Sequence, residues 1–215
     1  MLTTFYRRIA RFALLTALVA LLAGCKADEV ELQITTTDLR SAAAGNEVLV
    51  PFRAVFTHPE PLNTRQSAQV DDIWSVLQEY VEISDFSRDT VDGGLRVVIE
   101  GEVPVRTTRN ARDAYYLSLT ESRDFEGLHR VALETGEQFE TLRQQLSAVN
   151  FAVDLVAIHP TVTEVSGRAS RLMAPAATIE GDSHLIYRAR LDGSLRLRQS
   201  AGAFEQTGPG FFIAL

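Results

Sequence analysis

Four histidines are the side chains that could carry protons or bind a metal near neutral pH in this chain, namely His58, His129, His159 and His184. Imidazole is the commonest general acid-base group and a usual zinc ligand. No histidine lies at the close spacing to another histidine, a cysteine or a carboxylate that is typical of zinc sites. His58 and His159 each precede a proline, where an extended backbone and a turn are expected. We therefore expect surface loop histidines, no metal ion and no cofactor.

Acidic side chains form two groups that could in principle do acid and base work. Glu100 and Glu102 share one face of an expected strand, and Glu134, Glu137 and Glu140 lie around the start of an expected helix. Acidic residues at a helix start are explained by the helix dipole alone. Two glutamates on one strand face are explained by the solvent side of an antiparallel sheet. The simpler interpretation is structural, so no catalytic residue is predicted.

The sequence Gly181-Asp182-Ser183-His184 resembles the first block of the serine esterases named for Gly-Asp-Ser-Leu. In that family the block lies near the mature N-terminus after a buried strand, and an Asp-x-x-His pair follows far downstream. Here the block lies near the end of the printed sequence, and no histidine follows it. A Gly-x-Ser-x-Gly motif and the glycine-rich phosphate loops of nucleotide enzymes are missing as well. We therefore predict that the protein is not an enzyme.

Cys25 is the only cysteine, and its thiol could accept an acyl group. It ends the sequence Leu-Ala-Gly-Cys directly after an apolar run at 12–22, and residues 1–11 carry three arginines and no acidic residue. The run is shorter than the roughly 20 apolar residues that span a bilayer, and its length is typical of a signal peptide. The last four residues of this segment resemble the lipobox of bacterial lipoproteins.

The resemblance implies that residues 1–24 are a signal peptide that is removed, and that Cys25 becomes an S-diacylglycerol cysteine with a palmitoylated amino group. Residues 25–29 would be the lipidated N-terminus and a short tether, so the folded domain would lie close to its membrane. Lys26 in place of aspartate implies the periplasmic face of the outer membrane rather than the inner membrane, by the sorting pattern of enteric bacteria. The alternative is an ordinary secretory signal with Cys25 near the cleavage site.

The charge balance limits the partners. The chain has 21 basic and 28 acidic residues and a net charge of -7, and removal of residues 1–24 removes three arginines and no acid, which leaves -10. Nucleic acid is not an expected partner, because phosphate binding needs clustered lysine and arginine. An acidic surface also disfavours adhesion to anionic head groups beyond what the lipid itself supplies. A single cysteine excludes a disulfide framework.

Alternation of apolar and polar residues predicts strands at 30–34, 48–56, 95–105, 115–119 and 131–133. Asp92-Gly93-Gly94 predicts a tight turn that joins the segment at 86–91 to the strand that follows. Pro59 and Pro61 end the second strand, because proline cannot donate to a sheet ladder.

Two amphipathic helices are predicted from three- and four-residue spacing. The first has the apolar stripe Val70, Ile73, Trp74, Leu77 and Val81. Because Trp74 belongs to this stripe, we expect it to pack in the core rather than serve as a ligand-stacking platform. The second helix begins at a capping box formed by Thr135 and Gln138. Its apolar stripe is Phe139, Leu142, Leu146 and Val149.

The C-terminal third is expected to be entirely β, with strands at 151–157, 185–191, 195–197 and 211–215. Asp192-Gly193 lies between two alternating runs and predicts a hairpin turn. An apolar last strand is also typical of outer-membrane barrels, but the lipobox and the two amphipathic helices argue against that class.

The fold class that follows is α+β, an antiparallel sheet with two packed amphipathic helices and an all-β C-terminal third. Residues 30–215 are expected to form a single globular domain. Similar strand and helix patterns around the two helices raise the alternative of two related halves, at about 30–110 and 111–215.

These features predict a membrane-anchored bacterial lipoprotein that acts as a non-enzymatic interaction or scaffold subunit of an envelope assembly, with an envelope protein as its partner. The first alternative is a periplasmic binding protein for a small or apolar ligand, and the second is an envelope hydrolase. An apolar patch on an acidic surface would favour the interaction subunit, and a deep apolar pocket would favour the binding protein. Converging histidine and acidic groups would favour the hydrolase.

Overall fold

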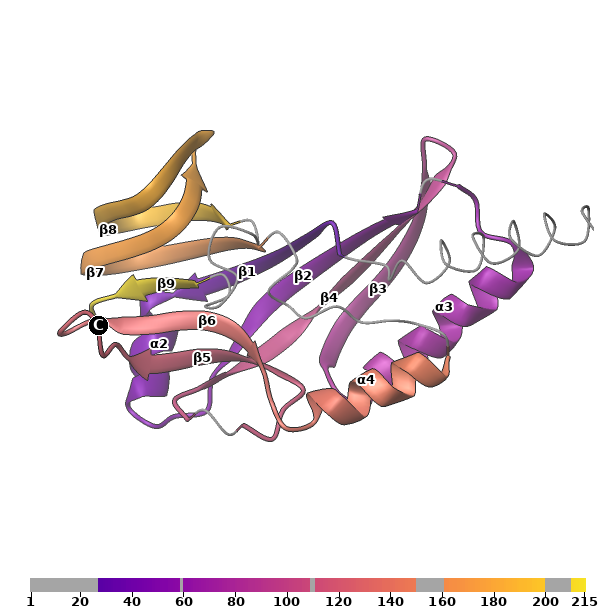
Figure 1. The fold of residues 1–215 in the computed structure, drawn as a ribbon, viewed down its shortest axis with the longest axis horizontal. Coiled ribbons are helices and arrows are strands. Elements are labelled where there is room, and N and C mark those ends of the chain that lie inside the picture. The colour runs from indigo at the N-terminus through magenta and orange to yellow at the C-terminus, as the bar shows by residue number, and fades with distance from the viewer. Residues whose placement is uncertain (1–26, 59, 109–110, 150–160, 200–209) are drawn as a thin grey trace, which may run out of the picture.

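The computed structural model describes residues 27–58, 60–108, 111–149, 161–199 and 210–215. Of these residues 58% lie in strands and 19% in helices, so the protein is mostly β. Within the described residues the elements run in the order β1, α2, β2, α3, β3, β4, β5, β6, α4, β7, β8, β9 (Figure 1).

The first three elements are β1 (Glu29–Thr35), α2 (Thr36–Ala43) and β2 (Leu49–His58). Both strands were predicted, whereas α2 was not. Thr35 ends the strand and caps the helix at once, because its hydroxyl accepts a hydrogen bond from the Asp38 amide and the Asp38 carboxylate accepts one from the Thr35 amide, each 3.0 Å long. This capping box lets the chain turn from strand to helix without a loop.

The next elements are α3 (Thr64–Leu77), β3 (Glu82–Val91) and β4 (Gly94–Arg106). The predicted hairpin is confirmed, and so is the predicted helix, although α3 ends at Leu77 and Val81 of the predicted stripe lies after it. Asn63 caps α3 through a capping box with Gln66. Asp92 and Gly93 have φ angles of 51° and 82°, which is the pair of positive values that a two-residue type I′ hairpin turn requires.

The middle of the chain forms β5 (Tyr115–Glu121), β6 (His129–Thr135) and α4 (Phe139–Ala148). The predicted capping box of Thr135 and Gln138 is wrong. Thr135 pairs with Tyr115 in the sheet, and Gln138 is the N-cap residue with no side-chain cap. The apolar stripe of α4 is nevertheless as predicted, with Phe139, Leu142 and Leu146 buried.

The last strands are β7 (Thr161–Ile179), β8 (Asp182–Gln199) and β9 (Gly210–Ile213). The hairpin turn predicted at Asp192-Gly193 is wrong, because β8 continues through these residues and the chain reverses at Glu180-Gly181 instead. Gly193 pairs with Gly167 of β7, and both have a φ of 116°, so the two strands change direction together at this pair. The strand predicted at 151–157 lies outside the described residues.

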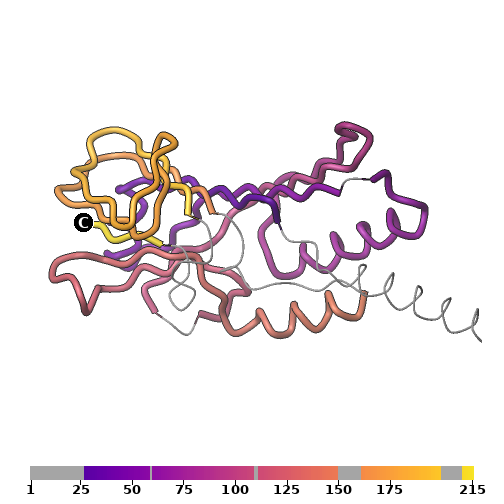
Figure 2. Tube along the Cα trace, turned by 45° about the horizontal axis from the view of Figure 1, so that its top comes forward, coloured from indigo at the N-terminus to yellow at the C-terminus, as the bar shows by residue number. Residues whose placement is uncertain are grey.

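The hairpin of β7 and β8 coils back on itself (Figure 2). Ala177 near the end of β7 pairs with Gln199 at the end of β8, and on its other side with His184 near the start of β8. The Gln199 amide strengthens this closure by donating to the carbonyl oxygens of Pro175 and Gly210, at 2.8 and 2.9 Å.

Seven strands close into a barrel in the order β1, β2, β4, β5, β6, β9, β7, with β7 paired in parallel to β1. The pairing of β4 with β5 is also parallel. β3 and β8 lie outside the ring, each beside one of its strands. The predicted antiparallel sheet with two packed helices is therefore wrong. Local alternation identifies strands, but it carries no information on the pairing of β1 with a strand so far along the chain.

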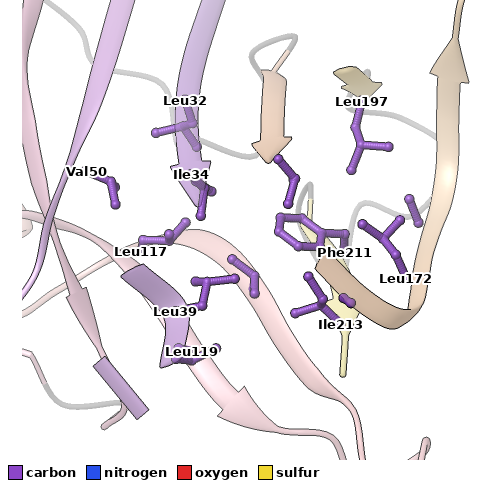
Figure 3. Packing of buried hydrophobic residues seen from close by; sticks show 14 of the residues in the cluster. Leu32, Ile34, Leu39, Val50, Leu117, Leu119, Leu172, Leu197, Phe211 and Ile213 are labelled. Atoms are coloured by element: carbon purple, nitrogen blue, oxygen red, sulfur yellow. The ribbon is translucent and has the colours of Figure 1, made fainter. Parts of the chain in front are cut away.

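Leucine, isoleucine, valine and phenylalanine side chains fill the barrel, as in other small barrels. Leu32 and Ile34 of β1, Leu119 of β5 and Phe211 of β9 are all at most 2% exposed (Figure 3). Leu39 of α2 is fully buried among them, and α2 contacts β1, β4, β5 and β7. The unpredicted helix α2 therefore covers one end of the barrel.

The two predicted helices lie elsewhere, with α3 beside β3 and α4 beside α3 (Figure 1). α3 and α4 pack on each other around a second, small cluster with three buried members, Ala114, Leu142 and Leu146. The Gln69 side chain of α3 also donates a 3.0 Å hydrogen bond to the carbonyl oxygen of Val149, just after α4. Burial raises the pKa of Tyr115, which packs against this cluster, so its phenol stays neutral.

Candidate interaction surfaces

α3 is amphipathic, yet none of its 14 residues is buried. The shorter helices α2 and α4 each bury three residues. Ile73, Val76 and Leu77 of this helix pack against the small cluster with α4, whereas Val70 and Trp74 lie outside it and are half-buried by the described part of the chain. These two side chains are candidates for contact with another molecule. We define the α3 surface by them and by one half-buried neighbour on β3, namely Val70, Trp74 and Phe86.

A row of stacked side chains joins α3 to β3. Trp74 stacks on Phe86 with ring centroids 4.3 Å apart and an angle of 26° between the planes. The guanidinium carbon of Arg88 lies 4.8 Å from the Phe86 ring centroid, and Arg88 Nη2 donates a 2.6 Å hydrogen bond to Asp71 Oδ1. Trp74 belongs to neither hydrophobic cluster of the described residues, so the expectation that it packs in the core is not met.

The tip of the hairpin between β7 and β8 exposes two adjacent apolar side chains. Leu185 is 73% exposed and Ile186 is 51% exposed. Neighbouring residues of a strand point to opposite faces, so the tip is apolar on both sides. The sequence analysis predicted only an alternating strand at 185–191 and did not identify this site. The missed signal is the run of Leu185, Ile186 and Tyr187, which breaks the alternation of a half-buried strand.

Arg188 and Arg190 follow on the same face of β8 as Ile186, and both are exposed. Within the described part of the chain neither side chain has a hydrogen bond or an ion pair. Arg196 and Arg198 of the same strand do, since they pair with Glu31 at 2.6 Å and with Glu29 at 3.1 Å. The hairpin tip therefore combines apolar side chains with two arginines that make no direct ion pair among the described residues.

The first group of acidic residues belongs to the sheet surface. Glu100 pairs with Arg53 at 3.2 Å, and Arg53 reaches Glu31 at 3.5 Å, so the ion pairs cross β4, β2 and β1. Glu102 lies on β4 opposite Glu82 and Pro51. These positions agree with the structural interpretation of both glutamates.

The second group of acidic residues, Glu134, Glu137 and Glu140, does not form one cluster either. Glu134 pairs with Arg130 at 2.6 Å, and Glu140 makes a two-point contact with Arg143 at 2.9 and 2.6 Å. The Arg143 guanidinium lowers the pKa of Glu140, so that carboxylate is fully ionised. Glu137 is exposed between them. An ionised acid beside an arginine is a poor proton donor, and this arrangement favours surface ion pairs over acid-base catalysis.

The histidines lie on separate elements. His58 ends β2, His129 begins β6, and His184 lies on β8 with its ring 5.1 Å from that of Tyr187. His159 lies outside the described residues. Among the residues that the structure describes, no group of three or more histidine, cysteine, aspartate or glutamate side chains could hold a metal ion.

Ser183, the serine of the esterase-like block, lies at the start of β8, where its hydroxyl is 3.3 Å from that of Thr178 on β7. The block therefore forms a hairpin end, since Gly181 is part of the turn. It leads from β7 into another strand, β8, and not into a helix as a nucleophile motif would.

The chain is held by the barrel from Ala27 onward. Ala27 is 4% exposed, the Asp28 amide donates to the Val55 carbonyl oxygen at 2.8 Å, and Thr57 donates to the Asp28 carboxylate at 2.5 Å. Cys25 and Lys26 lie outside the described residues, so acylation of Cys25 stays a prediction. Over the described ranges, no helix has the length and apolar character needed to cross a membrane.

Comparison with known proteins gives no relative. No protein family, no curated protein and no solved structure matches this chain. Its function is therefore inferred from the two surfaces, α3 with its stacked row and the hairpin tip, together with the N-terminal sequence.

Proposed function

We propose that this protein is a bacterial lipoprotein, anchored by acylated Cys25 on the periplasmic face of the outer membrane, that acts as a non-enzymatic interaction module of an envelope assembly. The observation that carries the interaction role is the α3 surface, because a 14-residue amphipathic helix without a buried residue leaves apolar area for a partner. The anchor is supported by the lipobox sequence and by the start of the fold directly after it.

The dimensions of the α3 surface favour a protein partner. A helix of 14 residues is about 21 Å long at 1.5 Å per residue. Small-molecule sites are concave and enclose most of their ligand, whereas Trp74 of α3 with Phe86 and Arg88 of β3 gives this surface the aromatic and arginine content of a protein interface centre. A partner with apolar side chains would cover the stacked rings, and its acceptors would meet Arg88.

The small size of the second cluster adds to this argument. With three buried residues, the cluster of α3 and α4 contributes less burial than the barrel does. Regions with few buried apolar contacts open more easily than the rest of a fold. Binding at the α3 surface would therefore also stabilise α3 itself.

The tether supports anchoring close to the membrane. Only Lys26 separates Cys25 from buried Ala27, and two residues span about 7 Å at most. Acyl chains on Cys25 would therefore bring the barrel against the head groups. We expect labelling by a palmitate analogue in cells, loss of the label in Cys25→Ser, and recovery of the protein with outer membranes. Equal labelling of Cys25→Ser would contradict the anchor.

The partner role is tested by crosslinking in living cells. A photoreactive amino acid at Val70, on the α3 surface, should give one protein adduct, and the same probe at Leu49, an exposed residue at the start of β2, should not. Combining the Val70 probe with Trp74→Ala should abolish the adduct while the protein remains at normal abundance. An adduct that persists in Trp74→Ala, or that forms equally at Leu49, would contradict binding at this surface.

The same experiment separates the alternatives. A binding protein for an apolar ligand would give no protein adduct at Val70, and a small molecule would be released from the purified protein on denaturation. That result would replace the interaction module by the ligand-binding alternative. Trp74 would then be its stacking platform.

A further inference from the structure

We propose that the tip of the hairpin between β7 and β8 is a second contact with the bilayer that holds the acyl chains of Cys25. The contact consists of Leu185 and Ile186, which enter the interface, and of Arg188 and Arg190, which meet anionic head groups. This inference rests on the proposed anchoring at Cys25 and deepens it. A single point of attachment leaves the domain free to rotate, whereas two contacts would fix its orientation.

The strand pairing brings the tip close to the point where the chain enters the barrel. Val30 pairs with Thr161, Thr161 with Gln199, Gln199 with Ala177, and Ala177 with His184. Paired Cα atoms lie about 4.5 to 5.5 Å apart, so these four steps place His184 within about 22 Å of Val30. The hairpin coils back on itself (Figure 2), which brings the first residues of β8 within this distance of the beginning of β1.

The short tether to Cys25 places the membrane near the beginning of β1. The barrel holds the chain from Ala27, and Glu29 is tied to Arg198 of the hairpin by a 3.1 Å ion pair. Cys25 is two residues before Ala27, which limits its distance to about 7 Å. The acyl chains and the hairpin tip are therefore close enough to reach one bilayer surface.

The chemistry of the tip suits a membrane interface. Leu185 and Ile186 expose apolar side chains on opposite faces of β8. The acyl region of a bilayer can surround both side chains together. A strand of a partner protein added to the edge of β8 would leave one of the two faces in water. The turn also carries Glu180 and Asp182, so the arginines on the same strand offset these acids. The exposed edge of β8 still needs water for its backbone groups, so the contact is shallow.

The other exposed hairpin end offers less apolar surface. Val91, before the turn between β3 and β4, is 46% exposed, and no second large apolar residue of this hairpin is exposed in the described part of the chain. Asp89 and Asp92 lie beside it, with Arg96 opposite Asp89. The adjacent pair Leu185 and Ile186 therefore distinguishes the β7–β8 tip from this hairpin.

The test uses the acylated protein in vesicles of phosphatidylethanolamine and phosphatidylglycerol. Because acylation blocks the thiol of Cys25, Leu185→Cys supplies the only free thiol for an environment-sensitive fluorophore. The matched control is Leu49→Cys, an exposed leucine on β2 well before Val55, the residue that pairs with Glu29. We expect a blue shift and quenching by nitroxide-labelled lipid at position 185, and neither at position 49.

A second variant reads out the charge. Adding Arg188→Gln and Arg190→Gln to Leu185→Cys should reduce the quenching, and should do so more as the phosphatidylglycerol content rises. These substitutions lie on exposed positions, so a normal melting temperature is expected alongside. If the quenching is unchanged by both substitutions and by the phosphatidylglycerol content, Arg188 and Arg190 do not contribute to the contact.

The remaining outcomes decide the proposal. If the protein floats with the vesicles but the label at position 185 stays in water, the anchor stands and the hairpin contact is wrong. If the label is shielded in native membranes but not in lipid vesicles, a protein covers the tip and the lipid contact is wrong. If the protein does not float at all, the anchoring at Cys25 fails, and the contact fails with it.

Discussion

Trp74 of α3 stacks on Phe86 of β3, with ring centroids 4.3 Å apart, and both rings remain half-buried. The pair joins a helix to a strand that lies outside the closed barrel. Because both rings are partly exposed, a partner could cover their exposed surface without unfolding the protein. The two rings therefore link the stability of α3 to its proposed binding role.

Trp74→Ala is expected to lower the free energy of unfolding by about 1 to 2 kcal/mol, below the roughly 3 to 5 kcal/mol typical of a buried tryptophan. The control is Leu119→Ala in the barrel, at 1% exposure, which should cost about 2 to 5 kcal/mol. Urea unfolding of both variants gives the comparison. A larger loss for Trp74→Ala than for Leu119→Ala would show that Trp74 acts as a core residue after all.

Gly167 and Gly193 offer a matched pair of substitutions. They face each other, and both have a φ of 116°, so alanine costs backbone strain at either position. A Cβ at Gly167 would also collide with the Thr36 hydroxyl at the start of α2, whereas a Cβ at Gly193 meets nothing within 4 Å. We expect Gly167→Ala to be less stable than Gly193→Ala by about 1 to 3 kcal/mol in urea unfolding.

The Thr36→Ala background supplies the control for this pair. Removing the Thr36 hydroxyl should reduce the difference in the free energy of unfolding between Gly167→Ala and Gly193→Ala, because the nearest colliding atom is gone. An unchanged difference would mean that contact with α2 is not its cause.

Asp113 gives a pH-dependent prediction. Arg106 donates two hydrogen bonds to its carboxylate, at 2.8 and 3.0 Å, and these lower the pKa of Asp113. A lowered folded-state pKa contributes stability that is present above the unfolded pKa of about 3.9 and is lost as the pH falls through the folded value. Asp113→Asn should therefore be less stable near neutral pH, by up to about 1 kcal/mol, and the deficit should shrink below about pH 4. A deficit that is constant across pH in urea unfolding would contradict this.

Local elements could be predicted from the sequence, and their assembly could not. The alternation at 30–34 and 48–56 and the Asp92-Gly93 turn are local signals, and the corresponding strands and turn are present. Closure of the barrel depends on β1 pairing with β7, which no short-range pattern encodes. Asp192-Gly193 has the sequence of a hairpin turn because a strand kink with Gly167 opposite needs the same backbone freedom as such a turn.

The candidate surfaces, too, could be predicted from the sequence only in part. The stripe of α3 was visible as periodicity, but periodicity identifies an apolar side without saying how well it is covered, and here no residue of the helix is buried. The hairpin tip was hidden because Leu185 fits an alternating strand, and only the position of the true turn at Glu180-Gly181 shows that it projects. Cys25 was identified from a local motif, and its acylation remains a prediction.

Complementation of a deletion strain by a protein in which His58, His129, His159 and His184 are all replaced by glutamine tests the central claim most directly. Histidine is the usual proton-transfer residue near neutral pH, so most hydrolase or metal mechanisms would need at least one of the four. With abundance, export and acylation confirmed as normal, we expect the quadruple variant to restore the cellular role as fully as the unaltered protein. Failure of a folded, acylated quadruple variant would contradict a non-enzymatic interaction module, and single reversions would then locate the active histidine.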